Sequence, residues 1–138
     1  MKPDVLEAVA EIERAAIGSG VRYEPDPDGG AYVIIDGVEL GESFDPPTTW
    51  FGFHIVWTYP EDDVYPYFIG SELKYVGSEP TPNQSPDGNL PVPLVRGQEM
   101  PGFKLAAIQV SRKSNRRNAE TDSALLKTIR VLEFLRSL

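Results

Sequence analysis

The chain contains no cysteine, a single histidine and few residues of positive charge. The missing cysteine excludes disulfides, thiolate metal sites and thiol nucleophiles from this chain. The 13 Lys and Arg residues stand against 21 Asp and Glu residues, which gives a formal net charge of -8 at pH 7. Nucleic-acid binders gain most of their affinity from Lys and Arg that contact phosphates, so no nucleic-acid partner is expected.

Long hydrophobic runs and signature motifs are also missing. Acids at positions 4, 7, 11 and 13 interrupt the apolar pattern of the N-terminal segment, so it is neither a signal peptide nor a membrane span. The lone histidine, His54, has no second His or Cys with which to hold a metal. The motifs GxxxxGK[ST], GxGxxG and GxSxG are absent, which argues against phosphate-binding enzymes and nucleophilic hydrolases. We therefore expect a cytoplasmic protein with no membrane partner, metal or cofactor.

What is present suits one compact domain over residues 1–138, because the length and the 41% hydrophobic content allow one sizeable core. Apolar residues at helical spacing predict an N-terminal helix, with Asp4 as N-cap and Glu7 completing a capping box. The stretch "VRYEPDPDGGAYVIIDGVEL" then offers short β-prone runs. "DPDGG" and the dipeptide Asp36-Gly37 are expected to break these runs into two or three strands, with a tight hairpin turn at Asp36-Gly37.

The next stretch, "TWFGFHIVWTYPEDDVYPYF", alternates strictly between two faces of a strand. One face carries Phe51, Phe53, Ile55, Trp57 and Tyr59, and the other carries Trp50, Gly52, His54, Val56 and Thr58. The first set is predicted to face the core. Proline has no N–H, so Pro60 should end the strand and Pro66 should lie at an edge, a turn or a bulge. The acids of residues 61–63 are expected to form a solvated turn between the two Tyr-Pro pairs.

The C-terminal half begins with a segment unsuited to regular structure. Residues 76–102 contain six of the 13 prolines and are predicted to form a long irregular loop. "FKLAAIQVS" predicts one more strand, and a helix is expected to start near Thr121 or Asp122. Its apolar stripe would contain Leu125, Leu126, Ile129, Leu132, Leu135 and Leu138. Val131 and Phe134 lie outside that stripe and leave an oligomer open.

These elements together predict an α+β domain, an antiparallel β-meander flanked by N-terminal and C-terminal helices. This layout resembles the ubiquitin-conjugating (UBC) fold. The stretch "WFGFHIVWTYPEDDVYPYF", with Tyr59-Pro60 and Tyr65-Pro66, is similar to that family's strand-and-turn motif, with two extra residues before the second Tyr-Pro. The related RWD domains share a similar Tyr-Pro element. The resemblance is nearest to divergent bacterial members of the superfamily.

The chain departs from the family at its catalytic centre. Active conjugating enzymes carry ubiquitin on a cysteine after the sheet and have a His-Pro-Asn motif upstream, and this chain has neither. "DGNLPVPL" resembles the neighbourhood of that cysteine and would bring Pro91 to its position, but proline has no nucleophile. Cysteine-less members of the superfamily act as binding modules. The resemblance therefore implies a non-catalytic partner in a bacterial ubiquitin-like conjugation system, which binds a ubiquitin-like protein or its activating enzyme.

Two groups of residues are candidates for binding such a partner. In the family the first helix docks the activating enzyme, which assigns Glu7, Glu11 and Arg14 to partner contact; the exposed face of the sheet can bind ubiquitin. Independently of the resemblance, "SRKSNRRN" gathers the basic residues Arg112, Lys113, Arg116 and Arg117 before the last helix. Arginine forks bind carboxylates and phosphates in bidentate fashion, so this segment is either a docking patch or a charged surface loop.

Two other functions stay open at this point. One is an active ubiquitin-like conjugating enzyme whose catalytic cysteine has been replaced, in which case the native protein is a transferase. The other is an acidic inhibitor or immunity-type protein that presents carboxylates to a basic partner. The acids are scattered through every predicted element, which weighs against the inhibitor.

Overall fold

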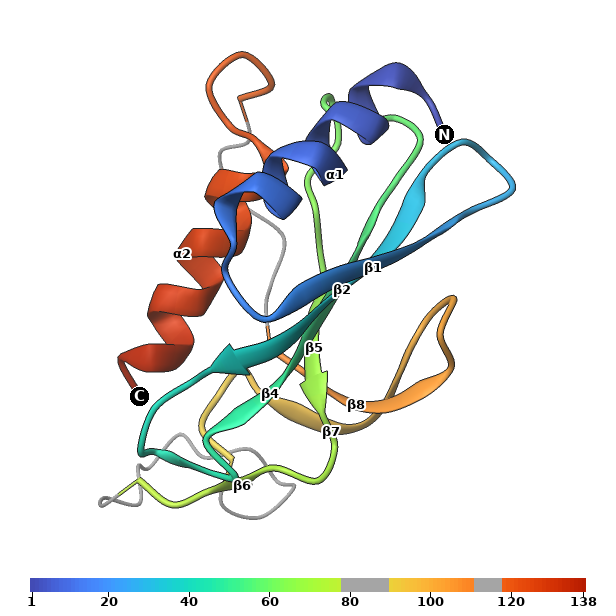
Figure 1. The fold of residues 1–138 in the computed structure, drawn as a ribbon. Helices are drawn as coiled ribbons and strands as arrows, with labels where there is room; N and C mark the ends of the chain where they lie inside the picture. Colours follow the sequence, from blue (N-terminus) through green and yellow to red (C-terminus); the bar gives the residue numbers. More distant parts are fainter. Residues whose placement is uncertain (78–89, 111–117) are drawn as a thin grey trace.

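A computed structural model describes residues 1–77, 90–110 and 118–138 of the chain (Figure 1). Its helices are α1, Pro3–Ala15, and α2, Ala124–Arg136. Its strands are β1 Gly20–Pro25, β2 Ala31–Glu39, β3 Phe44–Asp45, β4 Thr48–Ile55, β5 Tyr67–Gly70, β6 Lys74–Tyr75, β7 Val95–Met100 and β8 Leu105–Gln109. The predicted α+β class, an antiparallel sheet flanked by an N-terminal and a C-terminal helix, is confirmed.

The main sheet has six strands in the order β1-β2-β4-β5-β8-β7, and each neighbouring pair is antiparallel. β3 and β6 pair separately as a small second sheet. The meander therefore runs from β1 to β5, and the β7–β8 hairpin extends it beyond β5. Helices α1 and α2 lie side by side against one face of the main sheet (Figure 1). We call this helix-covered side the inner face and the opposite side the outer face.

Aromatic side chains of β4 and β5 fill the core on the inner face. Phe51, Phe53 and Ile55 are fully buried, as the alternation along β4 predicts. The ring of Phe51 stacks on that of Tyr67, with 5.1 Å between the centroids. The same alternation places Trp57 in the core, and that prediction is wrong. Trp57 is 51% exposed, because β4 ends at Ile55 and the chain turns before reaching it.

The first helix begins two residues earlier than the capping box predicts. α1 starts at Pro3, with Lys2 at the N-cap and no side-chain hydrogen bond there, so the prediction of Asp4 as cap is wrong. Proline suits the first helical position, because its φ is already helical and its missing N–H would have no partner within the helix. The helix ends at Ala15, and Ala16 follows in the left-handed conformation with φ 49°.

The second helix starts slightly later than predicted and buries a set of residues that overlaps only in part with the predicted stripe. The Ser123 hydroxyl accepts a hydrogen bond from the Leu126 N–H at 3.0 Å, and the helix begins at Ala124. The residues that this helix buries are Ala124, Lys127, Thr128, Val131, Leu132 and Leu135. The predicted leucine stripe is therefore only partly right. Val131 packs into the core, so it offers no surface to a second chain, whereas Phe134 is at the surface.

The two predicted turns of the first half have different outcomes. The turn after Pro25 is present, because β1 and β2 pair up to Pro25 opposite Ala31 and the "DPDGG" residues connect them. The predicted hairpin at Asp36-Gly37 is wrong. β2 continues through both residues, and Gly37, with φ 63°, lies at an irregularity in the pairing of β2 with β4. A positive φ serves a β-bulge as well as a tight turn, so the dipeptide alone does not distinguish them.

The Tyr-Pro element connects the sheet to the second helix. The Tyr59 hydroxyl accepts a hydrogen bond from the Ala124 N–H at 3.1 Å, at the start of α2. The Tyr67 hydroxyl and Thr128 Oγ1 lie 2.9 Å apart within the core. Pro60 lies in the turn after β4, and Pro66 directly precedes β5, so neither interrupts a strand. The element thus contributes polar contacts that hold α2 on the sheet.

The turn between the two Tyr-Pro pairs is not fully solvated, contrary to expectation. Glu61 and Asp62 are exposed, but Asp63 is 4% exposed and its Oδ2 accepts from Lys127 Nζ at 2.7 Å. The side chains of this ion pair are 1% and 9% exposed. A buried charge is stable only when it is paired, so each partner makes the burial of the other tolerable.

The predicted irregular loop over residues 76–102 contains regular structure. Residues 78–89 lie outside the described part, but β7 occupies Val95–Met100 and pairs with β8, so the prediction is wrong there. The Arg96 guanidinium donates to the main-chain oxygens of Ser71 and Leu73 at 2.9 and 2.7 Å. The strand is short of β-branched residues and follows a proline-rich segment, which hides it from periodicity arguments.

The outer face of the sheet carries a second, smaller core under the β7–β8 hairpin. Its buried members are Ile34, Phe68, Met100 and Ala107, with Tyr32, Trp50, Phe103 and Leu105 partly buried around them. Gly52 makes room for this cover, because a Cβ at that position would lie 3.0 Å from the Met100 sulfur. The outer face of the sheet is therefore partly covered.

Candidate functional site

Two of the three candidate residues on α1 contact each other. Arg14 Nη2 lies 3.0 Å from Glu7 Oε1, and the two side chains are 64% and 62% exposed. Glu11 is half-buried on the same helix. Exposed ion pairs contribute little to stability, so Glu7 and Arg14 are available to a partner at small cost.

The basic segment cannot be placed relative to α1. Arg112, Lys113, Arg116 and Arg117 lie outside the described residues, which resume at Asn118. The docking patch predicted from that segment therefore stays a prediction.

Pro91, the position that resembles the family's cysteine, is buried. Leu90 and Leu94 have no exposed surface, and the Leu94 N–H donates to the Pro91 main-chain oxygen at 2.9 Å. A thioester needs a nucleophile that a partner can reach. Pro91 provides neither the nucleophile nor the access.

A histidine–aspartate pair, which the sequence does not reveal as a pair, joins the β1–β2 turn to the outer face of β4. His54 Nε2 lies 2.5 Å from Asp26 Oδ2, and the His54 ring stacks on Tyr32 with 4.3 Å between centroids. Asp26 Oδ1 accepts from the main-chain N–H groups of Asp28 and Gly30 at 2.8 and 2.9 Å. The carboxylate therefore closes the turn and orients the imidazole at once.

The charge state of Asp26 follows from these contacts. Burial acts against its charged form and is the largest single influence, but the hydrogen bonds from His54, Gly30 and Asp28 together outweigh it and lower the pKa of Asp26. With an anionic Asp26 as acceptor, the His54 imidazole donates through its Nε2–H. The carboxylate thus orients the imidazole as it would orient a catalytic base. Catalysis through a covalent intermediate also needs a nucleophile beside that base. In the part of the chain that the structure describes, His54 makes its polar and ring contacts with Asp26 and Tyr32.

The turn that carries Asp26 also anchors the N-terminus and Trp57. The Lys2 N–H donates to the Gly29 oxygen at 2.9 Å, and Lys2 Nζ donates to the Trp57 oxygen at 2.8 Å. Lys2 Nζ also lies 5.4 Å from the centre of the Trp57 ring. The exposed tryptophan is therefore held in place at the surface.

A second outer-face contact involves β1. Arg22 makes two hydrogen bonds to the Asp36 carboxylate, at 2.7 and 2.9 Å, and these raise the pKa of Arg22 above its usual value. The same guanidinium lies 5.6 Å from the Phe103 ring at the tip of the β7–β8 hairpin. The Arg22 side chain is therefore engaged in contacts within the fold, with Asp36 and Phe103.

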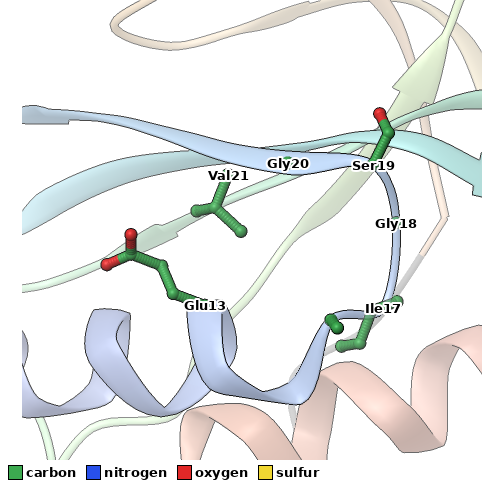
Figure 2. A pocket seen from close by; sticks show the side chains of 7 residues that line it. Glu13, Ile17, Gly18, Ser19, Gly20 and Val21 are labelled. Atoms are coloured by element: carbon green, nitrogen blue, oxygen red, sulfur yellow. The ribbon is translucent and has the colours of Figure 1, made fainter.

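A pocket of about 260 Å³ opens between the C-terminal end of α1 and the start of β1. Its lining residues are Glu13, Ala16, Ile17, Gly18, Ser19, Gly20 and Val21. Figure 2 shows Glu13 reaching from α1 toward β1 and Val21 extending from β1 toward the helix, whereas Ser19 points away from it. The pocket therefore combines one carboxylate with apolar walls.

Gly18, which lines this pocket, allows the chain to pass very close to the main chain of β2. A Cβ at Gly18 would lie 2.1 Å from the main-chain oxygen of Asp36, which no real side chain tolerates. None of the pocket residues is recognisable as a site from the sequence. The only signal available there was the "GSG" segment, which is equally typical of an ordinary turn after a helix.

Other site classes find no support in the part of the chain that the structure describes. No three His, Asp or Glu side chains of residues 1–77, 90–110 and 118–138 gather as ligands for a metal ion. Neither helix among them is long and apolar enough to cross a membrane. No protein-family model, curated protein or solved structure matches the chain.

Proposed function

We propose that this chain is a non-catalytic binding domain in a bacterial ubiquitin-like conjugation system, and that it binds the ubiquitin-like protein or its activating enzyme. One observation carries the proposal: a chain whose helix, meander, Tyr-Pro element and final helix resemble the UBC layout contains no cysteine. The resemblance supplies the biological setting, and the missing cysteine removes thioester chemistry from it.

The surroundings of Pro91 support binding without catalysis. Pro91 is buried, as are Leu90 and Leu94, so a partner's C-terminus has no access to this position. The Tyr-Pro element has a structural task that is independent of catalysis, because Tyr59 contacts the start of α2. An element kept for folding alone is consistent with a domain that has a UBC-like layout and no conjugating activity.

The first helix supports a docking role. Glu7 and Arg14 are largely exposed and are engaged only with each other among the described residues, so a partner can break their pair at little cost. Charged residues of this kind at an interface steer association and select partners more than they add raw affinity.

The test is a calorimetric titration of the domain against a ubiquitin-like protein and an activating enzyme of the same bacterium. We expect binding with one of them, and a severalfold loss of affinity in Glu7→Gln and Arg14→Ala. Glu133→Gln is the matched control, since Glu133 is an exposed acid on the other helix. Absence of heat with both proteins, at concentrations in the high micromolar range, would contradict the proposal.

A further inference from the structure

The first strand of the main sheet is an open edge. β1 lies at one end of the strand order, and among the described residues it pairs only with β2. Five of its six residues are exposed and Val21 is half-buried. Natural proteins usually blunt such edges, because unpaired main-chain groups accept strands from other chains. In Figure 1, β1 runs along the border of the sheet beside α1.

The pairing with β2 decides which main-chain groups point outward. The Asp26 N–H donates to the Gly30 oxygen at 3.0 Å, in line with the β1–β2 register. Alternation along an antiparallel pair then directs the main-chain groups of Arg22 and Glu24 toward β2, and those of Val21 and Tyr23 away from it. Pro25 has no N–H and blunts the far end of the edge. Val21 and Tyr23 are therefore the positions at which another strand would form main-chain hydrogen bonds.

The pocket described above lies at the open end of this same edge. Val21 contributes to both, since its side chain lines the pocket and its main-chain groups face outward. A residue directly opposite Val21 on an added strand would have its side chain on the same face of the sheet. That face is the one where Glu13 approaches β1, as Figure 2 shows.

The chemistry of the pocket selects a cation. The Glu13 carboxylate makes no hydrogen bond or ion pair with another described residue. It stands in the last turn of α1, where the helix dipole adds negative potential. Ile17 and Val21 offer apolar walls for the methylene stem of a long side chain. The net charge of -8 adds long-range attraction for a basic partner.

We propose that β1 accepts an extended segment of a partner protein as an additional strand, and that a lysine or arginine of this segment enters the pocket and pairs with Glu13. The added strand forms main-chain hydrogen bonds at Val21 and Tyr23. This inference rests on the proposed function in one respect, because it names the surface through which a binding domain holds its partner.

Paired substitutions test the two parts of the inference on the native complex. Tyr23→Pro removes an outward N–H and is compatible with an edge strand, whereas Tyr23→Val removes the same ring and keeps the N–H. Glu13→Gln removes the charge, with Glu133→Gln as the control. We expect roughly tenfold weaker binding for Tyr23→Pro relative to Tyr23→Val and for Glu13→Gln relative to its control, as the loss of a charged or main-chain hydrogen bond implies.

A second experiment uses no conjugation protein and so separates this inference from the proposed function. Short synthetic peptides of alternating Thr and Val, with a central Lys or a central Glu, are titrated into the isotope-labelled domain and followed by NMR. We expect the Lys peptide to shift the amide signals of Val21 and Tyr23, and the Glu peptide to leave them unchanged. In Glu13→Lys the preference should reverse.

The outcomes are distinguishable. Shifts at Val21 and Tyr23 that depend on the peptide charge and on Glu13 support the inference, even if neither conjugation protein binds. Equal responses to the two peptides, or no response at these amides, overturn it. If a conjugation partner binds while Tyr23→Pro and Glu13→Gln match their controls, the edge is not its docking surface, and the proposed function stands without it.

Discussion

Removal of the Asp26 side chain should destabilise the fold by an amount that its contacts determine. Asp26 is 8% exposed and accepts three hydrogen bonds, two from main-chain N–H groups of its own turn and one from His54. In Asp26→Ala the Gly30 N–H is left in a buried position without this acceptor, whereas the Asp28 N–H and His54 are partly exposed and water replaces part of their loss.

The expected magnitude follows from these three contacts. A buried donor that loses its acceptor costs about 1–3 kcal/mol, and each partly exposed hydrogen bond contributes at most about 1 kcal/mol. We therefore expect Asp26→Ala to lower the free energy of unfolding by about 2–4 kcal/mol, out of the roughly 5–15 kcal/mol typical of a domain. Urea denaturation at neutral pH measures this difference directly.

The pH dependence gives the sharper assay. Because the pKa of Asp26 is lowered in the folded protein, its charge stabilises the fold above the unfolded pKa of about 3.9, and this contribution is lost as pH falls through the folded pKa. Asp26→Asn keeps the side-chain shape but has no such titration. The stability gap between the native protein and Asp26→Asn should therefore be constant above about pH 5 and narrow below about pH 4.

Two results would refute this reasoning. One is a loss below about 0.5 kcal/mol for Asp26→Ala, which is the size of an ordinary surface substitution. The other is a gap between the native protein and Asp26→Asn that does not change with pH, since the charge of Asp26 would then make no difference to folding.

The remaining predictions use the same denaturation assay. Gly18→Ala should cost about 3 kcal/mol or prevent folding, because its Cβ meets the Asp36 oxygen at 2.1 Å, whereas Gly20→Ala, which meets no atom within 4 Å, should stay within about 0.5 kcal/mol; equal costs would contradict the close packing at Gly18. Asp63→Ala should cost about 3–5 kcal/mol, because it leaves Lys127 in the core without this carboxylate. Adding Lys127→Met to Asp63→Ala should recover part of that loss, and strict additivity of the two substitutions would show that the pair is not coupled.

Local periodicity predicted those elements whose pattern is both long and regular. The alternation from Phe51 to Ile55 identified the central strand and its buried face, because apolar and other residues alternate there without interruption. The same alternation wrongly predicted that Trp57 faces the core, because the spacing of residues does not show where pairing with a neighbouring strand stops. The hairpin turn predicted at Asp36-Gly37 is wrong for a related reason, because a positive φ at Gly37 fits a bulge in β2 as well as a hairpin turn.

The candidate sites depend on contacts between distant residues and were beyond sequence reasoning. Asp26 and His54 are separated by 28 positions and meet only because β1, β2 and β4 are neighbours. Lys127 lies outside the predicted apolar stripe of the C-terminal helix, and its burial depends on Asp63, 64 positions away. The pocket at Glu13 likewise arises only from the approach of α1 to the edge strand.

The most direct test of non-catalytic binding is intact mass spectrometry of the native protein after incubation with its activating enzyme, the ubiquitin-like protein and ATP, with the complex first isolated by gel filtration. We expect the domain to elute with one of these proteins and to retain its unmodified mass. A mass increase equal to the ubiquitin-like protein would contradict the account, because it would show that the domain carries that protein covalently and is a conjugating enzyme.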